Sequence, residues 1–232
     1  MRRRSIPELM DDPALATHEH HRALQSLNRA NSLFRFDSRL FKEAVRLAGS
    51  RSISVLDLGC GGGGFLNLVG GTHPPLNGSI RVGIDPSFRA ISAARRWSNG
   101  RTRWVAGDAR RLPFADSSFD VVVSSLLLHH LDRNDVPLLL REAARVARVG
   151  IVMSDLTRSG HSLALTWSAT RILSRSHVFH VDGPRSVRAA WTPRELRNFA
   201  RQAGLTNGVV RRQFPFRMVL SWRKTDAEKR LA

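Results

Sequence analysis

The sequence predicts a doubly wound α/β fold, in which helices cover both faces of a mainly parallel sheet. Apolar runs of strand length alternate with helical patterns from residue 53 to residue 155. Residues 119–123 form an apolar run of the kind found in strands buried on both faces. Strands that alternate with helices favour parallel pairing through right-handed crossovers. The 232 residues are enough for one such domain with additions.

Residues 1–50 are predicted to form a helical cap ahead of this core. Asp12-Pro13 is a good helix start, because Asp serves as an N-cap and Pro suits the first helical position. We expect that helix to fade near Asn31 and a second one to run from Asp37 or Ser38 to Gly49. The cap either extends the packing of the core or covers a substrate.

The core itself is expected in residues 51–232, with strands and helices in alternation. Its parallel strands are predicted at 53–58, 80–85, 102–106, 119–123 and 150–155, and its helices at 63–70, 87–98 and 134–147. Ser87 is the expected cap of the second of these helices. Residues 74–78 are a loop by their Pro and Gly content.

Residues 157–191 do not fit a minimal core of this kind. Apolar residues between 163 and 173 suggest a helix, and 177–191 is expected to be irregular. An insertion after the fifth strand stands at the carboxyl edge of the sheet, where ligands bind in such folds. We interpret it as a substrate lid; the alternative is additional packing.

The end of the chain predicts a capped helix and two closing strands. The helix begins at Thr192-Pro193 and runs to residue 203. Strands are expected at 207–212 and 215–222, where alternate residues from Phe214 to Trp222 are apolar. Residues 225–232 have the composition of a frayed, charged tail.

A glycine cluster after the first core strand predicts a nucleotide-like ligand, and two cofactors compete for it. Gly59, Gly61 and Gly64 match the G-x-G-x-x-G fingerprint of dinucleotide-binding proteins. That fingerprint also requires an acidic residue ~20 positions after the glycines, and Asp85 lies at about this spacing. Asp57, two residues before the first glycine, discriminates between them. A carboxylate at the end of a buried strand needs a partner. Pyrophosphate would be repelled there, whereas S-adenosylmethionine (SAM) offers an ammonium and a sulfonium group.

The string from Val55 to Phe65 resembles motif I of the class I SAM-dependent methyltransferases. Leu112-Pro113-Phe114, followed by Ser118-Phe119-Asp120, is typical of the family's ubiquinone-biosynthesis-like, or type 11, branch. The resemblance implies a Rossmann-like, seven-stranded sheet with an antiparallel last strand, and SAM as the cofactor. The closing pair of strands matches the antiparallel hairpin of that family, which a dinucleotide-binding domain lacks.

The resemblance also implies which residues bind the cofactor. Asp85, at the end of the second strand, is the acceptor for the ribose hydroxyls, and Asp108 accepts from the adenine amine. Ser124 is expected beside the methionine portion. The full predicted set is Asp57, Gly59, Gly61, Asp85, Pro86, Asp108, Ala109 and Ser124.

Candidate catalytic residues are His130, His180 and Asp182. His129 and His130 follow the fourth strand; either can serve as a general base, because His titrates near neutrality, or can brace the loop. His180 and Asp182, two apart before a Gly-Pro turn, can activate a phenol or hold the lid closed. A base is needed only if the acceptor must lose a proton, since positioning alone can supply about 7–11 kcal/mol.

No metal site is expected from the sequence. A single cysteine, Cys60, excludes a disulfide framework and a multi-cysteine zinc site. Asp155 ends the fifth strand, but alone it does not make the paired-carboxylate magnesium site of catechol-type methyltransferases.

The formal charge of +18 opens a second reading, an RNA methyltransferase. Against it, the arginines are scattered along the chain, and no Asn-Pro-Pro-Tyr or Asp-Pro-Pro-Tyr string follows the fourth strand. A non-enzymatic cofactor-binding partner protein and an NAD oxidoreductase are weaker alternatives. The lid composition favours a small aromatic or lipid-like acceptor, with O-methylation of a phenolic, quinone or polyketide-like compound.

The expected location is the cytoplasm. The N-terminus lacks the apolar segment of a signal peptide, and no apolar stretch approaches the ~18 residues that a transmembrane helix needs. Contact with a membrane is expected to be peripheral at most, and the sequence leaves the oligomeric state open.

Overall fold

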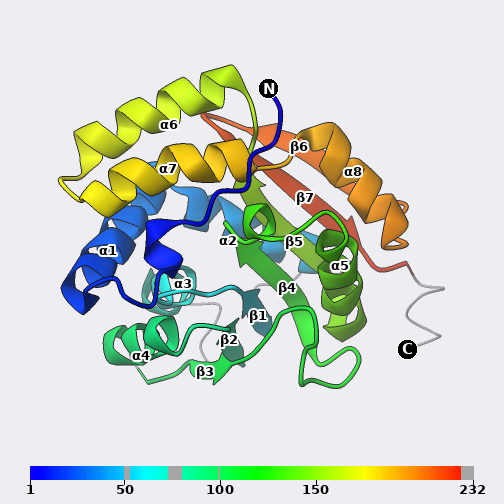
Figure 1. The fold of residues 1–232 in the computed structure, drawn as a ribbon. Helices are drawn as coiled ribbons and strands as arrows, with labels where there is room; N and C mark the ends of the chain where they lie inside the picture. Colours follow the sequence, from blue (N-terminus) through cyan, green and yellow to red (C-terminus); the bar gives the residue numbers. More distant parts are fainter. Residues whose placement is uncertain (50–52, 73–79, 99, 226–232) are drawn as a thin grey trace.

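The structure, a computed structural model, describes residues 1–49, 53–72, 80–98 and 100–225. Within these ranges seven strands form one sheet in the order β3-β2-β1-β4-β5-β7-β6 (Figure 1). The strands are β1 (Val55–Leu58), β2 (Arg81–Asp85), β3 (Arg103–Ala106), β4 (Phe119–Ser125), β5 (Ala147–Leu156), β6 (Val209–Gln213) and β7 (Arg217–Arg223). The first five pair in parallel, and β7 runs antiparallel to both β5 and β6. The predicted seven-stranded sheet with its reversed last strand is confirmed.

Helices cover both faces of the sheet and its carboxyl edge. They are α1 (Thr17–Leu33), α2 (Phe36–Ala48), α3 (Gly64–Thr72), α4 (Phe88–Trp97), α5 (Asp135–Val146), α6 (Gly160–Leu173), α7 (His177–Ala189) and α8 (Pro193–Gln202). Two short 3₁₀ turns, η1 (Leu9–Asp11) and η3 (Leu128–His130), lie at the same edge. No helix in the described part of the chain is long and apolar enough to cross a membrane.

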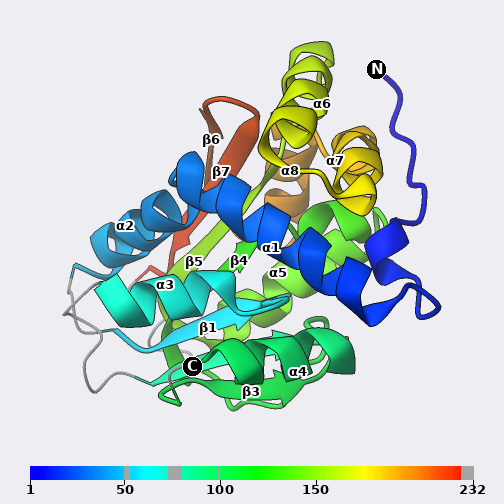
Figure 2. The same ribbon diagram turned by 90° about the vertical axis from the view of Figure 1, so that its left-hand side faces the viewer.

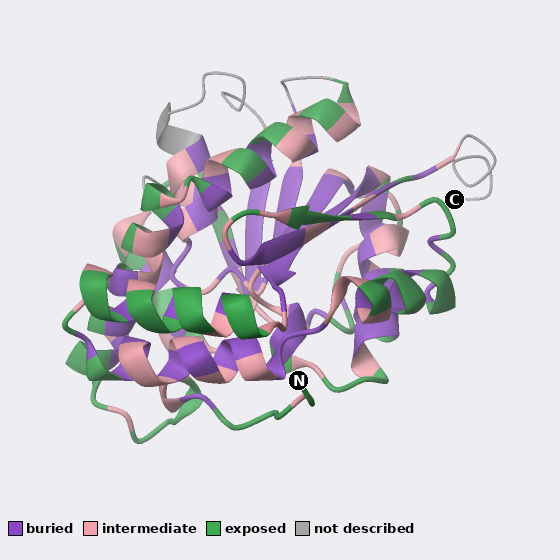
Figure 3. Cartoon of the chain, turned by 90° about the horizontal axis from the view of Figure 1, so that it is seen from above, coloured by how far each residue is buried: buried purple, intermediate pink, exposed green. Residues whose placement is uncertain are grey.

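Alternate residues of the central strands supply two separate cores. Val121 and Val123 of β4 pack in the cluster that contains residues of α2, α3 and α4, whereas Val122 packs in the cluster of α5 and α8. Side chains alternate across a strand, so a continuous apolar run fills both layers. Figure 2 shows the sheet between these helices, and Figure 3 shows that its central strands are buried.

Most of the helix caps predicted from the sequence are present in the structure. The Ser87 side chain accepts a hydrogen bond from the Ala90 N–H at the start of α4. Thr192 and Glu195 form a complete capping box at the start of α8, with proline at the first turn. Gly49 ends α2 in the left-handed conformation. The predicted boundary at residue 50, the loop at 74–78 and most of the tail lie outside the described residues.

Two predictions about helices are wrong. Asp12-Pro13 does not begin α1; the Asp12 carboxylate accepts from the Ala14 N–H and closes a turn instead, and the helix starts at Thr17. Residues 177–189 are helical, not irregular. There Gly183 does not make a turn; a Cβ at Gly183 would lie 2.6 Å from Thr170, so glycine permits α7 to pack closely on α6.

The chain before α1 is bound to the outside of the core as an extended segment. Residues 3–12, which we call the N-terminal strap, cross α7 and η3 at the carboxyl edge of the sheet (Figure 1). The Arg3 side chain donates to the carbonyls of Ala189, His129 and Leu131. Its guanidinium also lies 3.8 Å from the centre of the Trp191 ring. The strap therefore closes over the ends of the strands.

Candidate functional site

The main cavity lies at the carboxyl ends of β1 to β4 and has a volume of about 800 Å³. Its floor comes from the turns after these strands, and α1 and the strap close it from above. From β1 the chain adds β2 and β3 on one side and then returns to add β4 and β5 on the other. The switch point of the sheet therefore lies between β1 and β4, and open α/β sheets bind ligands at this position.

The glycine turn after β1 has backbone conformations that require glycine. Gly59 and Gly61 have φ angles of 65° and 51°, in the left-handed region. A Cβ at Gly59 would lie 2.9 Å from Leu127, whereas a Cβ at Gly61 would meet nothing within 4 Å. The Gly61 N–H donates to the Asp85 carboxylate at 2.9 Å. The turn thus leaves its backbone open to the cavity while the end of β2 holds it in place.

Asp57 carries the least compensated charge in this cavity. The residue is 1% exposed, and its Oδ1 has no hydrogen-bond partner among the described residues. Burial raises the pKa of the Asp57 carboxyl well above its usual range, and the nearby Asp37 and Asp85 raise it further. A cationic group in the cavity would stabilise the ionised form. This is the chemistry that the sequence predicted for SAM at this position.

Two further carboxylates extend from Asp57 along the cavity. Asp85 ends β2, where it accepts from the backbone N–H groups of Gly61 and Ser87, and burial raises the pKa of its carboxyl. Asp108 follows β3 and is half exposed; the Arg110 guanidinium bonded to it lowers the pKa of its carboxyl. Arg110 also reaches Asp135 at 2.6 Å, which fixes the loop after β3 against the start of α5.

The structure brings nearly all the predicted cofactor residues to this one cavity. Those that line it are Asp57, Gly59, Gly61, Asp85, Pro86, Asp108 and Ala109. Ser124 does not line it, because its side chain is buried and its hydroxyl donates to the Leu58 carbonyl at 2.9 Å. The next residue, Ser125, lines the cavity instead. Neighbouring residues of a strand point to opposite faces, so a shift of one position separates the two serines.

A second cavity of about 110 Å³ adjoins the first beneath α6 and α7. Both cavities are lined by Glu8, Met10, Leu27, Asn31, Leu126 and His130. The remaining wall is mostly apolar, from α1, α6, α7 and the ends of β5 and β7. Among the aromatic residues of the predicted lid, residues 157–191, Phe179 lines this cavity. Trp167 is 51% exposed on the outside of α6, and Trp191 is buried, donating to the Leu128 carbonyl.

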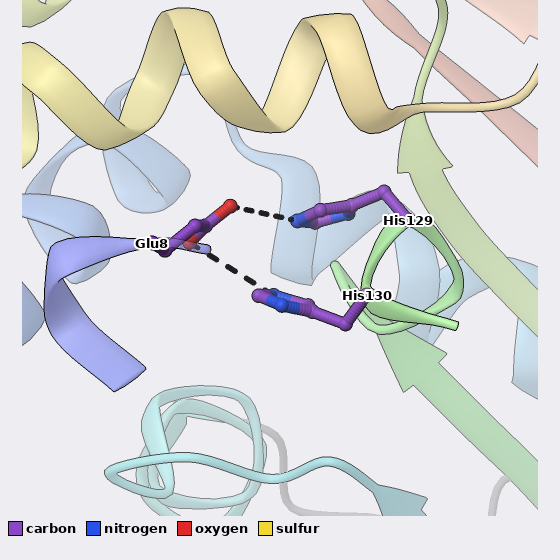
Figure 4. A group of neighbouring side chains, drawn as sticks. All are labelled: Glu8, His129 and His130. Carbon is purple, nitrogen blue, oxygen red and sulfur yellow. Dashed lines mark ion pairs between the residues drawn. The ribbon is translucent and has the colours of Figure 1, made fainter. Parts of the chain in front are cut away.

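Three side chains meet where the cavities join: Glu8 of the strap and His129 and His130 of η3 (Figure 4). His129 Nε2 lies 3.5 Å from Glu8 Oε1, and His130 Nε2 lies 4.0 Å from Glu8 Oε2. His129 Nδ1 is bonded to Asp155 at 2.7 Å. Despite burial, the two carboxylates raise the pKa of His129 to about 10, and His129 lowers the pKa of Glu8 to about 2. The sequence indicated the histidines but gave no signal for Glu8.

The predicted pair His180 and Asp182 is not brought together. Both lie on α7, where residues two apart do not face each other. Asp182 is buried at the second cavity and accepts from the backbone N–H groups of Leu9 and Met10 at 2.8 and 2.9 Å. Burial raises the pKa of its carboxyl to about 6. His180 Nε2 lies 2.6 Å from the Ser174 carbonyl, and the residue lines neither cavity.

Known proteins share this fold and these motifs. Residues 56–153 match a family described as a methyltransferase domain. The demethylmenaquinone methyltransferase of Roseiflexus sp. (strain RS-1) is 32% identical over 172 residues, which cover 68% of this chain and 69% of that protein. The fatty-acid O-methyltransferase of Mycolicibacterium smegmatis is 34% identical over 125 residues, 53% of this chain and 44% of that protein.

Solved structures of methyltransferases have the same architecture. The plantazolicin methyltransferase BpumL, in complex with a desmethyl-plantazolicin analogue and S-adenosylhomocysteine (SAH), matches with a TM-score of 0.65 and 16% identity. That match covers 86% of this chain and 89% of BpumL. The magnesium protoporphyrin IX methyltransferase of Synechocystis PCC 6803, with bound SAH, matches with a TM-score of 0.55 and 13% identity, over 93% and 91% of the two chains. At these identities the likeness concerns the fold.

Fold, cavity and sequence relatives together define a SAM-dependent methyltransferase. The chain belongs to the class I SAM-dependent methyltransferases, in the type 11 branch that includes the demethylmenaquinone methyltransferases. Its cofactor is SAM, as the carboxylate at the end of β1 indicated. The competing prediction, an NAD oxidoreductase, is thereby excluded.

Proposed function

We propose that this enzyme methylates a small apolar acceptor bound between α1, α6 and α7, on an oxygen of a phenolic, quinone or polyketide-like compound. The observation that carries the proposal is the second cavity. It is apolar, it opens into the cofactor-sized cavity, and His130 stands on their common wall. Apolar pockets with few polar groups suit small organic ligands, and at about 110 Å³ this cavity would enclose only the reacting part of the acceptor.

For the cofactor, we assign the charged and backbone groups of the main cavity. Asp57 would compensate the cationic methionine portion, and Asp85 would accept the ribose hydroxyls. Asp108 and the following backbone would hold the adenine, and the open backbone at Gly61 would let the cofactor approach closely. When bound, the cofactor supplies a methyl group that is already activated, so the chain's own task is to position the acceptor and exclude water.

For the acceptor, His130 is the candidate base. Its side chain is 33% exposed, its Nδ1 lies 3.4 Å from Asp11, and its ring borders both cavities. It is therefore placed to take a proton from a hydroxyl group held between the two cavities. We assign Asp182 a different task from the one the sequence suggested, since both of its oxygens already hold the strap. His180 has no position in this proposal.

The named activities of the relatives agree with an acceptor of this kind. They include a demethylmenaquinone methyltransferase, a fatty-acid O-methyltransferase and a malonyl-[acyl-carrier protein] O-methyltransferase. Each of those names describes the relative. A putative 23S rRNA (guanine-N(1)-)-methyltransferase is also similar, over 38% of this chain, so it is the balance of the named activities that favours a quinone-like or acyl acceptor over RNA.

The test is transfer of a labelled methyl group to a hydroquinone, a catechol, a long-chain fatty acid and RNA, in parallel. Ala169 lines the second cavity and Ala164 lies exposed on the same helix, which gives a matched pair of variants. We expect an apolar small molecule to be labelled. Ala169→Phe fills the second cavity and should cost about 1–3 kcal/mol of acceptor binding, so the KM for the acceptor should rise at least ~10-fold. The affinity for SAH should not change. Ala164→Phe should match the wild type. Labelling of RNA alone, or equal KM values for the two variants, would contradict the proposal.

A further inference from the structure

Glu8, His129 and His130 form a cluster with the composition and spacing of a metal site (Figure 4). One ligand atom of each residue lies within 4.8 Å of the other two. The two imidazole rings lie side by side, with centroids 4.2 Å apart and planes inclined by 35°. Both Nε2 atoms point toward the same carboxylate.

The opposite nitrogen of each ring faces a carboxylate. His129 Nδ1 is hydrogen-bonded to Asp155 at 2.7 Å, and His130 Nδ1 lies 3.4 Å from Asp11. A carboxylate on one imidazole nitrogen fixes the tautomer, so that the other nitrogen presents its lone pair, and metal-binding histidines almost always have such a partner. Here both histidines have one, and both free nitrogens turn to Glu8.

The separations fit a cation among the three groups. Metal bonds of about 2.0–2.2 Å to nitrogen and oxygen place neighbouring ligand atoms roughly 3.0–3.6 Å apart. The two distances to the Glu8 oxygens are 3.5 and 4.0 Å, longer than a hydrogen bond and close to this range. The Glu8 carboxylate is itself oriented by the Ser186 hydroxyl, which donates to Oε1.

An ion pair of protonated His129 with Glu8 and Asp155 accounts for only part of this arrangement. It explains one ring between two carboxylates, but not the approach of His130 Nε2 to the same Glu8. The charges of Glu8, protonated His129 and Asp155 also sum to −1, and the buried Arg217 guanidinium offsets this only in part, because it is shared between Asp155 and Asp37. A divalent cation with neutral imidazoles would bring the charge of these groups to zero.

We infer that Glu8, His129 and His130 bind a divalent first-row transition metal ion, with coordination positions left open toward the two cavities. Two imidazoles and one carboxylate are a donor set that suits Zn²⁺, Fe²⁺, Mn²⁺ or Co²⁺. Because Glu8 and His130 line both cavities, an open position faces the place where the acceptor would lie. There the ion would hold the acceptor oxygen and lower the pKa of its hydroxyl group, and it would take over the base role proposed for His130, whose Nε2 would then be a ligand. That last role rests on the proposed function; binding of the metal does not.

The test is a titration of the untagged, chelator-treated full chain with CoCl₂ and, separately, ZnCl₂. Calorimetry gives the affinity and stoichiometry, and the visible spectrum of Co²⁺ reports its ligands. We expect one ion per chain with a nitrogen-ligand spectrum. Glu8→Gln and His130→Gln remove ligands, and each should weaken binding by at least ~10-fold. Asp155→Asn keeps the three ligands but removes the carboxylate bonded to His129 Nδ1, and it should weaken binding about 10- to 100-fold.

Controls separate this site from the other histidine-rich segment and from a loss of folding. His18 and His21 lie on α1 away from the cluster, and a His18→Gln/His21→Gln double variant should bind like the wild type. His130→Gln serves as the variant least harmful to the fold, because its side chain is partly exposed. SAH binding, measured on every variant, reports whether the fold and the methyltransferase site persist. Absence of Co²⁺ and Zn²⁺ binding to the wild type, or unchanged affinity in Glu8→Gln and His130→Gln, would overturn the inference.

Discussion

Asp57→Asn is predicted to stabilise the cofactor-free protein while weakening its binding of the cofactor. The substitution keeps the shape of the side chain and removes its charge. In the structure that charge is fully buried, with one oxygen lacking a hydrogen-bond partner among the described residues and Asp37 and Asp85 close by. Stability and ligand affinity should therefore change in opposite directions.

The size and pH dependence of the stabilisation follow from the raised pKa of Asp57. An unfolded aspartate has a pKa of about 3.9, so the folded state binds more protons between that pH and its own higher pKa. The free energy of unfolding of the wild type consequently falls as pH rises through this window, by about 1.4 kcal/mol per unit of pKa difference, and is constant above it. The asparagine does not titrate. We expect it to be more stable by about 1–3 kcal/mol at pH 8 and to lose this advantage toward pH 4.

Thermal unfolding with and without SAH is the assay. A gain of 1 kcal/mol raises the Tm of a chain of this length by roughly 2–4 °C. With Asp57 in its proposed place beside the cofactor's ammonium group, removing its charge should cost about 1.5–3 kcal/mol of binding free energy, or roughly a 10- to 150-fold weaker SAH affinity by calorimetry. Asp116→Asn, at an exposed carboxylate, is the control. A lower Tm for cofactor-free Asp57→Asn at pH 8, or wild-type affinity for SAH, would refute the reasoning.

Two further predictions concern the glycine turn and the strap. Gly63 has a φ of 77° and a Cβ there would overlap Trp104, so Gly63→Ala should lower the free energy of unfolding in urea by about 2–4 kcal/mol. Gly100→Ala, with a φ of 78° but open space, should cost only about 1–2 kcal/mol; equal losses would contradict the packing argument. Asp182→Ala frees two N–H groups of the strap, so trypsin should cleave after Arg4 several-fold faster than in the wild type, and unchanged cleavage would count against the strap's anchoring.

The fold could be predicted from the sequence because its strands and caps are local signals. The apolar runs of β4 and β5 need no distant partner to be recognised, and the capping box of Thr192 and Glu195 is contained in four residues. Helix α7 was not predicted from the sequence, because the signal that explains it is not local. A Gly-Pro pair such as Gly183-Pro184 usually marks a turn. Here the glycine instead allows close packing against Thr170 of α6, a tertiary contact that no local pattern reveals.

The cofactor side of the site was equally predictable, since parallel strands bring their carboxyl ends to one edge. Asp57 is the residue before the last of β1, Asp85 is the last of β2, and the two strands are paired, so their proximity follows from topology. Ser124 shows the limit, because an error of one residue turns a side chain to the other face. Glu8 shows another: it lies in a segment without periodicity, and Arg3 and Asp182 fix that segment through bonds that involve backbone groups.

The predictable residues belong to the main cavity, and the residues that could not be predicted belong mostly to the second cavity. The predicted cofactor residues that line the main cavity lie between positions 57 and 109, inside the family match at 56–153. Most of the wall of the second cavity comes instead from α1, α6, α7 and the start of β7, outside that match. Resemblance therefore transfers the cofactor but not the acceptor. Under the proposed function, the shape and polarity of the second cavity, with Glu8 and His130 at its junction with the first, would determine which molecule is methylated.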